Sequence, residues 1–294
     1  ADLVEALQPL GVSRVRITGG EPLLRKNLPE LIRRLATLEG IEDLSLTTNA
    51  VFLGDQAADL RAAGLQRLTI SLDTLRADRF RELSRRDELA RALNGIETAQ
   101  AVGFRGTKLN AVVMRDENDD ELVDLLAFGA EHDIEVRFIE YMDVGGATRW
   151  SMDKVVSASE MLDRIQAVAG EIEPVDVDRT AAPADRFRLP TGQVFGIIAS
   201  TTRPFCSGCD RARITADGRF FSCLYAHEGT PLLPLLRTGS RQQGAASAAA
   251  VVASTWLERM DRGAEERSRE AERAPLAAED LRGQPHLEMH TRGG

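Results

Sequence analysis

The chain has 294 residues, of which 43% are hydrophobic and 28% are charged, the balance of a soluble globular protein with a large core. Its formal net charge of −9 argues against nucleic acid as the main partner. No stretch approaches the roughly 18 apolar residues of a membrane span, and the N-terminus carries no basic-then-apolar signal. Three clustered cysteines without disulfide-framework spacing agree with a reducing compartment, so we expect a cytoplasmic protein with no membrane partner.

The first half of the chain alternates between strand and helix patterns. Helical spacing at 2–10 ends at Gly11, and the next expected strands are 13–18, 42–48, 66–73, 107–114 and 134–142. Helical patterns lie between them at 27–38, 54–64, 76–102 and 119–132. Strands that alternate with helices predict right-handed βαβ units and a parallel sheet. Because the sequence opens inside a helix, we expect that one strand of the fold precedes it.

The pattern changes after Met142, which divides the chain into an expected first domain at 1–150 and a second at 151–294. The second domain is predicted to be an α+β layer with a helix at 157–170, strands at 186–189 and 193–200, and a charged helix at 256–274. A hairpin is expected to turn at Asp217 and Gly218. The low-complexity stretch 240–254 is compatible with a mobile insertion or with an alanine-rich helix.

Cys206, Cys209 and Cys223 are the three cysteines of the chain and form a C-x2-C-x13-C pattern. Clustered thiolates with arginines between them indicate a metal site. A 4Fe-4S cluster usually takes four thiolates, so three would leave one iron open to a small molecule. Structural zinc, with His227 as fourth ligand, and three unrelated buried thiols are the alternatives.

Ligands of parallel α/β folds lie at the C-terminal ends of the strands, so residues there are candidates for binding. Arg16 precedes a glycine pair that includes Gly20, while Thr47 and Ser71 end the next two strands. Glycines allow a close approach of the backbone to a ligand. Ordinary turns and helix caps are the alternative roles for these residues.

Three further groups stand out. Lys108 is one of three lysines in an arginine-rich chain, and alternation places it on one strand face with Asn110 and Val112. Arg211 and Arg213 point the same way in an extended segment and form a fork suited to phosphate oxygens, unless they are a solvated surface pair. Met142 ends the fifth expected strand, where core packing is the alternative role.

Taken together, the motifs resemble the GTP 3′,8-cyclase family, molybdenum-cofactor biosynthesis protein A, of the radical S-adenosylmethionine enzymes. They are, in chain order, RITGGEPLLR, LTTNA, TISLD, RFIEYMDVG, FCSGCDRARITADG with the later CL, and a terminal Gly-Gly. The resemblance covers nearly the whole chain, and the C-x2-C-x-R-x-R segment with the Gly-Gly end is its most specific part. It favours iron–sulfur over zinc.

The resemblance implies an incomplete (βα)6 TIM-like barrel, its first strand missing here, with a C-terminal α+β layer that carries an auxiliary 4Fe-4S cluster. In the family a first cluster, held by a C-x3-C-x2-C loop, cleaves S-adenosylmethionine to a 5′-deoxyadenosyl radical. The radical abstracts the 3′ hydrogen of GTP, and the ribose radical attacks guanine C8 to give 3′,8-cyclo-7,8-dihydro-GTP. A downstream cyclic pyranopterin monophosphate synthase acts on this product.

The same resemblance assigns roles residue by residue. Cys206, Cys209 and Cys223 would hold the auxiliary cluster, whose open iron meets guanine. The implied GTP contacts are Arg16, Thr47, Lys108, Arg211, Ala212 and Arg213, and the implied S-adenosylmethionine contacts are Gly20, Ser71 and Met142. Arg211, Arg213, Gly293 and Gly294 would take part in catalysis, although a frayed terminus is the alternative for the two glycines.

One departure bears on activity: no C-x3-C-x2-C occurs in these 294 residues. We therefore expect a fragment that lacks its N-terminal segment, carries one cluster and is inactive alone. The competing hypothesis is a catalytically silent nucleotide-binding barrel with structural zinc, and a third is a radical enzyme that acts on peptides. A homodimer remains open as the assembly.

Overall fold

The main sheet of the protein has eight strands in the order β1-β2-β3-β4-β5-β8-β7-β6. The computed structural model describes residues 1–144, 150–175, 182–270, 273–275, 277–283, 287–288 and 291. Strands β1 to β5 and then β8 pair in parallel, and β7 and β6 continue the sheet antiparallel. The strands are β1 (Arg14–Ile17), β2 (Asp43–Thr48), β3 (Arg67–Ser71), β4 (Lys108–Val113), β5 (Glu135–Glu140), β6 (Glu173–Pro174), β7 (Asp185–Arg188) and β8 (Val194–Ile198).

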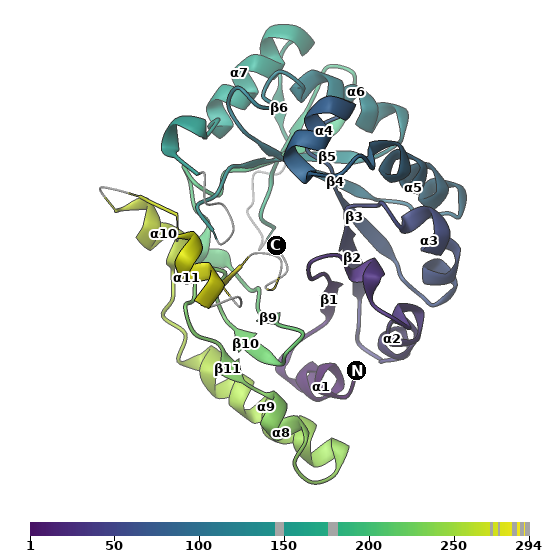
Figure 1. Ribbon diagram of the computed structural model, residues 1–294, viewed down its shortest axis with the longest axis vertical. Helices are drawn as coiled ribbons and strands as arrows, with labels where there is room; N and C mark the ends of the chain where they lie inside the picture. The colour runs from purple at the N-terminus through teal and green to yellow at the C-terminus, as the bar shows by residue number, and fades with distance from the viewer. Residues whose placement is uncertain are drawn as a thin grey trace.

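Helices cover the outer side of this curved sheet, and the strands curve around its opposite, inner side (Figure 1). The helices that connect the strands are α2 (Leu28–Ala36), α3 (Leu53–Ala62), α4 (Ala77–Ser84), α5 (Leu89–Ala101), α6 (Leu122–Glu131) and α7 (Ala158–Ala169), and α1 (Asp2–Leu7) precedes β1. Short 3-10 turns are η1 (Gln8–Leu10), η2 (Pro22–Leu24), η3 (Met152–Lys154) and η4 (Cys206–Gly208). Within the described ranges, no helix is both long and apolar enough to cross a membrane.

Strand alternation decides which side chains face the helices and which face the centre. Leu109 and Ala111 of β4 are fully buried in the core between sheet and helices. Their neighbours Lys108 and Asn110 are only partly buried and therefore lie on the opposite, inner face. This confirms the predicted alternation in β4. The inner face is the surface on which charged side chains gather.

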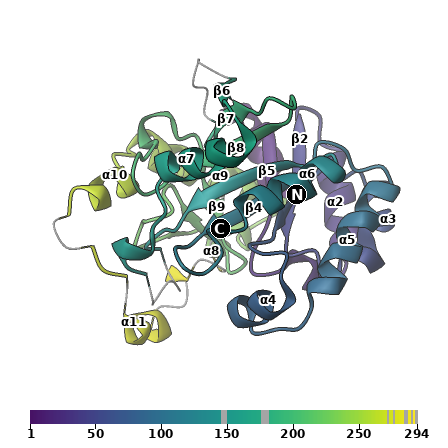
Figure 2. The ribbon, with the colours of Figure 1, turned by 90° about the horizontal axis from the view of Figure 1, so that it is seen from above.

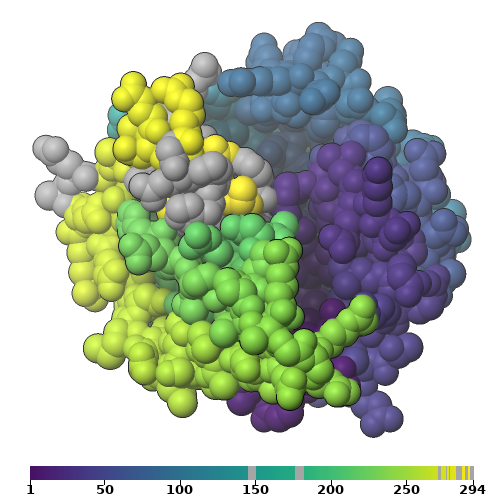
Figure 3. Space-filling view, turned by 60° about the horizontal axis from the view of Figure 1, so that its bottom comes forward, coloured from purple at the N-terminus to yellow at the C-terminus, as the bar shows by residue number. Residues whose placement is uncertain are grey.

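The C-terminal layer packs against the start of the chain. It contains a second sheet of β9 (Arg213–Ile214), β10 (Arg219–Phe221) and β11 (Thr230–Pro231), together with α8 (Leu233–Leu236), α9 (Arg241–Leu257), α10 (Gly263–Ser268) and α11 (Ala278–Gly283). A separate small core joins Leu7 of α1 to Phe220, Leu232 and Ala248. Figures 2 and 3 show these green and yellow segments beside the purple N-terminal part.

The structure confirms the predicted hairpin of this layer and decides between the two alternatives for the low-complexity stretch. β9 and β10 pair antiparallel, and Gly218 turns the hairpin with a φ of 80°. The low-complexity stretch 240–254 lies in helix α9, whose N-terminus has a capping box between Ser240 and Gln243. Of the two alternatives for that stretch, the alanine-rich helix is therefore the observed one.

Three element predictions are wrong. The single helix at 76–102 is two helices, because Arg85 adopts the left-handed conformation with a φ of 57° after α4. The helix at 256–274 is replaced by the end of α9 and the short α10, where Arg259 bonds the Cys209 carbonyl. The segment 193–200 was assigned to the appended layer, yet β8 pairs in parallel with β5. The main sheet therefore extends beyond residue 150.

Candidate functional site

Two of the expected GTP contacts lie on the inner face of the main sheet. Arg16 lies on β1 and Lys108 begins β4, on the same face as each other. Desolvation inside the fold, together with the charges of Arg137 and Arg67, lowers the pKa of Lys108 to about 8. Desolvation and neighbouring arginines also lower the pKa of Arg16. The pKa shifts show a concentration of positive charge, which an anionic ligand would relieve.

Two further arginines, Arg67 and Arg137, belong to this cluster. Arg67 donates from Nε to Asp43 Oδ1 at 2.7 Å, and Arg137 donates from Nε to Glu135 Oε1 at 2.7 Å. Each carboxylate neutralises part of the charge, and Asp43 and Glu135 both have lowered pKa values. Alternation within 134–142 was the available signal for Arg137, because it places Arg137 and Glu135 on one face.

Arg211 joins this inner cluster from the C-terminal layer. Its charge contributes to the lowered pKa of Arg16, so the two guanidiniums lie near each other. The Arg211 guanidinium stacks over the Phe205 ring at 4.9 Å, and its Nε is buried without a hydrogen-bond partner. Arg213 begins β9 and is partly buried, while Ala212 between them is exposed. A buried unpaired donor is costly and is a natural contact for an anionic oxygen.

Two of the three cysteines, Cys206 and Cys223, lie at the start of α10. The backbone N–H groups of Ala264 and Glu265 bond the sulfur of Cys206, which also feels the charge of Cys223. Gly263 lies so close to Cys223 that an added Cβ would be 3.1 Å from its sulfur. Cys209 lies on the other side of η4, where Arg211 Nη2 approaches its sulfur at 3.5 Å.

The electrostatic surroundings of the thiols differ. Burial opposes ionisation of Cys209, but hydrogen bonds and charge from Arg211, together with Arg259, outweigh it and lower its pKa. Burial raises the pKa of Cys206. Arg259 Nη1 also donates to the Cys209 carbonyl at 2.8 Å, which ties the cysteine loop to the segment before α10. Thiolate ligands are favoured where such cationic and N–H donors gather.

Within the described part of the chain, no three His, Cys, Asp or Glu side chains are placed as a formed metal-ion site. The chemistry of the donors nevertheless fits an iron–sulfur group, because two soft sulfur atoms lie at the start of α10 beside N–H donors and the third, in the same cysteine loop, lies beside guanidinium donors. His227 is exposed and lines a cavity of about 190 Å³ with Tyr225 and Arg267.

The expected S-adenosylmethionine contacts follow three parallel strands at their C-terminal ends. Gly20 lies in the turn after β1, Ser71 ends β3, and Met142 comes two residues after β5. Since these strands are parallel, the three residues share one edge of the sheet. Thr47 lies near the same end of β2 and is 9% exposed. This C-terminal edge of the sheet lies at the opposite end of the strands from Lys108, which is the first residue of β4.

Glu21, which follows the glycine pair, is held by protein donors. Its carboxylate accepts from Thr48 Oγ1 at 2.7 Å, from the Asn49 N–H at 2.9 Å and from the Leu23 N–H at 3.0 Å. It therefore joins the turns after β1 and β2. This contact fixes the position of the glycine pair beside it.

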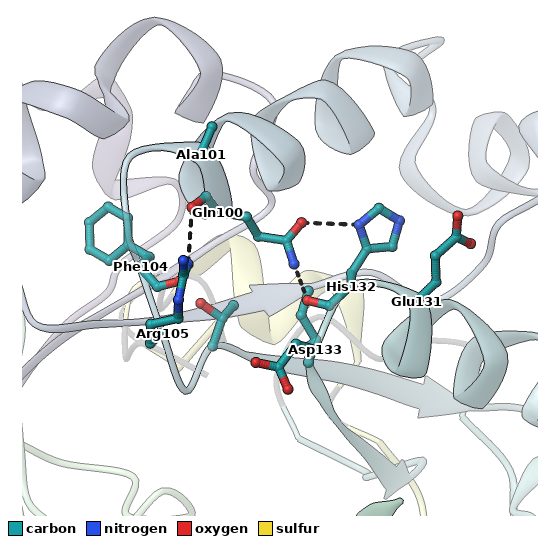
Figure 4. Close-up of a pocket in the computed structure, with 9 residues that line it drawn as sticks. Gln100, Ala101, Phe104, Arg105, Glu131, His132 and Asp133 are labelled. Atoms are coloured by element: carbon teal, nitrogen blue, oxygen red, sulfur yellow. Dashed lines mark hydrogen bonds between the residues drawn. The ribbon is translucent and has the colours of Figure 1, made fainter.

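A second hollow, larger than the cavity beside His227, lies at the N-terminal ends of β4 and β5 (Figure 4). It has a volume of about 450 Å³ and is lined by Gln100, Phe104, Arg105 and His132 among others. His132 Nδ1 lies 3.1 Å from Gln100 Oε1, and Arg105 Nη1 donates to the Gln100 carbonyl at 3.0 Å. None of the expected site residues lines it. The expected catalytic residues Gly293 and Gly294 lie outside the described residues.

Comparisons with known proteins divide the chain into two matched parts. The family described as Radical SAM superfamily matches residues 1–129, and the family described as Molybdenum Cofactor Synthesis C matches residues 134–264. Among solved structures, Streptococcus suis SuiB bound to S-adenosylmethionine is similar in fold, with a TM-score of 0.59 and 17% identity. That match covers 83% of this chain and 59% of the other.

Curated relatives are much more similar in sequence. GTP 3′,8-cyclase 1 of Mycobacterium tuberculosis is 48% identical over 99% of this chain and 82% of its own length. GTP 3′,8-cyclase of Xanthomonas campestris pv. campestris is 44% identical over 90% of this chain and 77% of its own length. Identity at this level along nearly the whole sequence shows that the chain belongs to the GTP 3′,8-cyclase family.

Proposed function

We propose that the protein is a radical S-adenosylmethionine lyase that converts GTP to 3′,8-cyclo-7,8-dihydro-GTP, the first step of molybdenum cofactor biosynthesis. Besides family membership, one observation carries the proposal: in a chain of net charge −9, the positive charges of Arg16, Lys108 and Arg211 lie near one another on the inner side of the sheet. A triphosphate needs such a local concentration of cations. Burial and the charges of neighbouring cations lower the pKa values of Arg16 and Lys108.

In this proposal the inner cations bind the triphosphate. Arg16 and Lys108 supply charge from the sheet, and Arg211 and Arg213 supply it from the C-terminal layer, with Thr47 and the Ala212 backbone as further contacts. The buried Nε of Arg211 would donate to a ligand oxygen. Arg211 also contacts Cys209, so substrate and cysteine site meet at this side chain.

Cys206, Cys209 and Cys223 would hold a 4Fe-4S cluster with one iron open to guanine. When bound in the family's first site, S-adenosylmethionine supplies the 5′-deoxyadenosyl radical that removes the 3′ hydrogen of GTP. Gly20, Ser71 and Met142 would position that cofactor at the C-terminal edge of the sheet. Arg211, Arg213, Gly293 and Gly294 would act in catalysis by orienting the substrate.

We further propose that the parallel strands form an incomplete (βα)6 barrel, with residues 1–150 as its main part and residues 151–294 as the layer that contributes the cysteines. Three free thiols suit a reducing compartment and support a cytoplasmic location. The partners would be GTP and the downstream cyclic pyranopterin monophosphate synthase. A homodimer is the assembly to test by light scattering.

Product analysis by chromatography tests the function. The 294 residues contain no C-x3-C-x2-C, so we expect the anaerobically reconstituted chain to bind GTP without forming 5′-deoxyadenosine. Joined to an upstream segment that carries a C-x3-C-x2-C loop, it should convert GTP after addition of dithionite and S-adenosylmethionine. ATP is the control substrate. Formation of 5′-deoxyadenosine by the 294 residues alone, or no cyclised product from the joined protein, would contradict the proposal.

A further inference from the structure

A buried carboxylate, Asp143, lies between the end of β5 and the cysteine layer. Its side chain is fully buried and accepts from Tyr225 Oη at 3.0 Å, from Arg267 Nη2 at 2.7 Å and from Arg273 Nη2 at 2.9 Å. Arg267 adds a second bond from Nε to Asp143 Oδ2 at 2.9 Å. Burial opposes the charge, but the bonds and charges of the two arginines outweigh it and lower the pKa of Asp143.

Two of the three partners of Asp143, Tyr225 and Arg267, belong to segments that touch a cysteine. Tyr225 comes two residues after Cys223, and its N–H lies 3.4 Å from the Cys223 sulfur. Arg267 lies on α10, whose first residues contact Cys206 and Cys223. Arg273 stacks over Trp150 at 5.1 Å, and Trp150 Nε1 donates to the Tyr141 carbonyl at 3.0 Å. Asp143 therefore connects the β5 end with both walls of the cysteine site.

Packing around α10 leaves little room for adjustment. A Cβ at Gly263 would lie 2.4 Å from Tyr225 Cβ and 3.1 Å from the Cys223 sulfur. A small displacement of α10 would therefore move the sulfur ligands or the N–H groups that bond them. In known metal sites, groups that orient the ligands are worth roughly 10–100-fold in metal affinity.

We propose that Asp143 is a positioning residue for the iron–sulfur site: its carboxylate holds α10 and the loop after Cys223 in the arrangement that brings the Cys206 and Cys223 thiols together. The inference rests on the proposed function, because it requires that these thiols bind a cluster. This positioning role differs from a general role in stability, because Asp143 acts on the cysteine ligands through two named contacts. One is its hydrogen bond with Tyr225, and the other is its ion pair with Arg267 of α10. Asp143 itself touches none of the cysteines in the hydrogen bonds described above.

Glu121 offers a matched control for the burial of a carboxylate. It is 0% exposed, accepts from Thr74 Oγ1 at 2.6 Å and from the Leu75 N–H at 2.8 Å, and pairs with Arg79. These partners join the loop after β3 to the start of α6, on the helices that cover the parallel strands. Glu121→Gln should lower the melting temperature as Asp143→Asn does, without acting on the cysteine site.

The experiment measures the rate of iron release to a chelator from anaerobically reconstituted protein, and the electron paramagnetic resonance spectrum of the reduced cluster. Asp143→Asn should release iron roughly tenfold faster than wild type or more, with an altered spectrum. Tyr225→Phe removes one hydrogen bond, keeps the ring and should give an intermediate rate. Glu121→Gln should match wild type in both readouts despite its lower melting temperature.

The outcomes separate the proposal from its premises. Iron release from Asp143→Asn at the rate of Glu121→Gln would overturn the positioning role, because loss of stability alone would then explain the variant. If Asp143→Asn does not fold, Tyr225→Phe carries the test, and a wild-type rate and spectrum there would overturn the proposal. Failure of the wild-type chain to bind iron with labile sulfide would overturn the proposed function and this inference together.

Discussion

The single residue Arg211 connects the proposed GTP site with the cysteine site. It approaches the Cys209 sulfur, stacks on Phe205 and leaves its Nε buried without a partner. A guanidinium in this position can neutralise thiolate charge and still donate to a phosphate or carbonyl oxygen. Its removal should therefore affect ligand binding more than folding.

We predict that Arg211→Ala weakens GTP binding by about 1.5–3 kcal/mol, which is roughly tenfold or more in the dissociation constant. Isothermal titration calorimetry on the reconstituted protein measures it. Arg33→Ala, on the exposed surface of α2, is the control and should bind GTP as wild type does. Equal affinities for all three proteins would remove Arg211 from the binding site.

Lys108 gives a pH dependence whose sign follows from its lowered pKa of about 8. The charged amine predominates below this pH and is lost as the pH rises through it. GTP affinity should therefore fall between about pH 7 and pH 9, whereas Lys108→Arg, which stays charged, should remove this part of the profile. The same fall in both proteins would show that another group controls the titration.

The sequence predicted only some of the charged inner residues. Lys108 stood out because lysine is rare in this chain and lies in an alternating strand. Arg67 and Arg137 were not predicted as part of the cluster, because arginine is common here and only the strand register brings them beside Lys108. The inward direction of a side chain is readable from alternation, but its neighbours depend on tertiary structure.

The close packing of α10 against the segment after Cys223 allows a test of whether the position of this helix controls iron binding. Gly263→Ala would place a Cβ 2.4 Å from Tyr225 Cβ, so α10 must shift. We expect a loss of about 1–3 kcal/mol in stability, as for other overpacked sites, together with a loss of bound iron. Gly208→Ala, which meets nothing within 4 Å, is the control. Full iron content in Gly263→Ala would show that the position of α10 does not control iron binding at the cysteine site.

Elements with a strong repeating pattern were the ones that the sequence predicted. The five strands from β1 to β5 and the hairpin of β9 and β10 follow local alternation and turn residues. The break after α4 was not predicted, because the left-handed Arg85 has no special local signal. Nor was the pairing of β8 with β5, because its partner lies more than 50 residues away. Long-range pairing is decided by packing that no local pattern contains.

At the scale of the whole molecule, charge is distributed unevenly. The chain is acidic overall, yet positive charge is concentrated where the inner face meets the cysteine layer. Arg16 and Lys108 supply this charge from the sheet, and Arg211 supplies it from the C-terminal layer. A net negative protein repels nucleotides at long range, so specificity for GTP must come from contacts inside this region. In this account, metal binding and nucleotide selectivity both depend on the region around Arg211, between the inner face and the cysteine layer.

We predict that the 294-residue chain binds one four-iron cluster, or about four irons with equivalent labile sulfide per chain. Colorimetric iron and sulfide analysis after anaerobic reconstitution measures it. Changing Cys206, Cys209 or Cys223 to alanine should each reduce the iron, while His227→Ala should retain it. Stoichiometric zinc, or equal loss of metal in His227→Ala, would instead support the four-ligand zinc site.

The most direct test of the account is electron–nuclear double resonance on the reduced, reconstituted chain with GTP labelled with nitrogen-15 in the guanine. The account predicts a nitrogen-15 coupling to the cluster, because three cysteines leave one iron open to the base. ATP labelled in the adenine is the control and should give no such coupling. A GTP spectrum without nitrogen-15 coupling, from protein that binds both cluster and GTP, would contradict the claim that the cysteine site holds the substrate base.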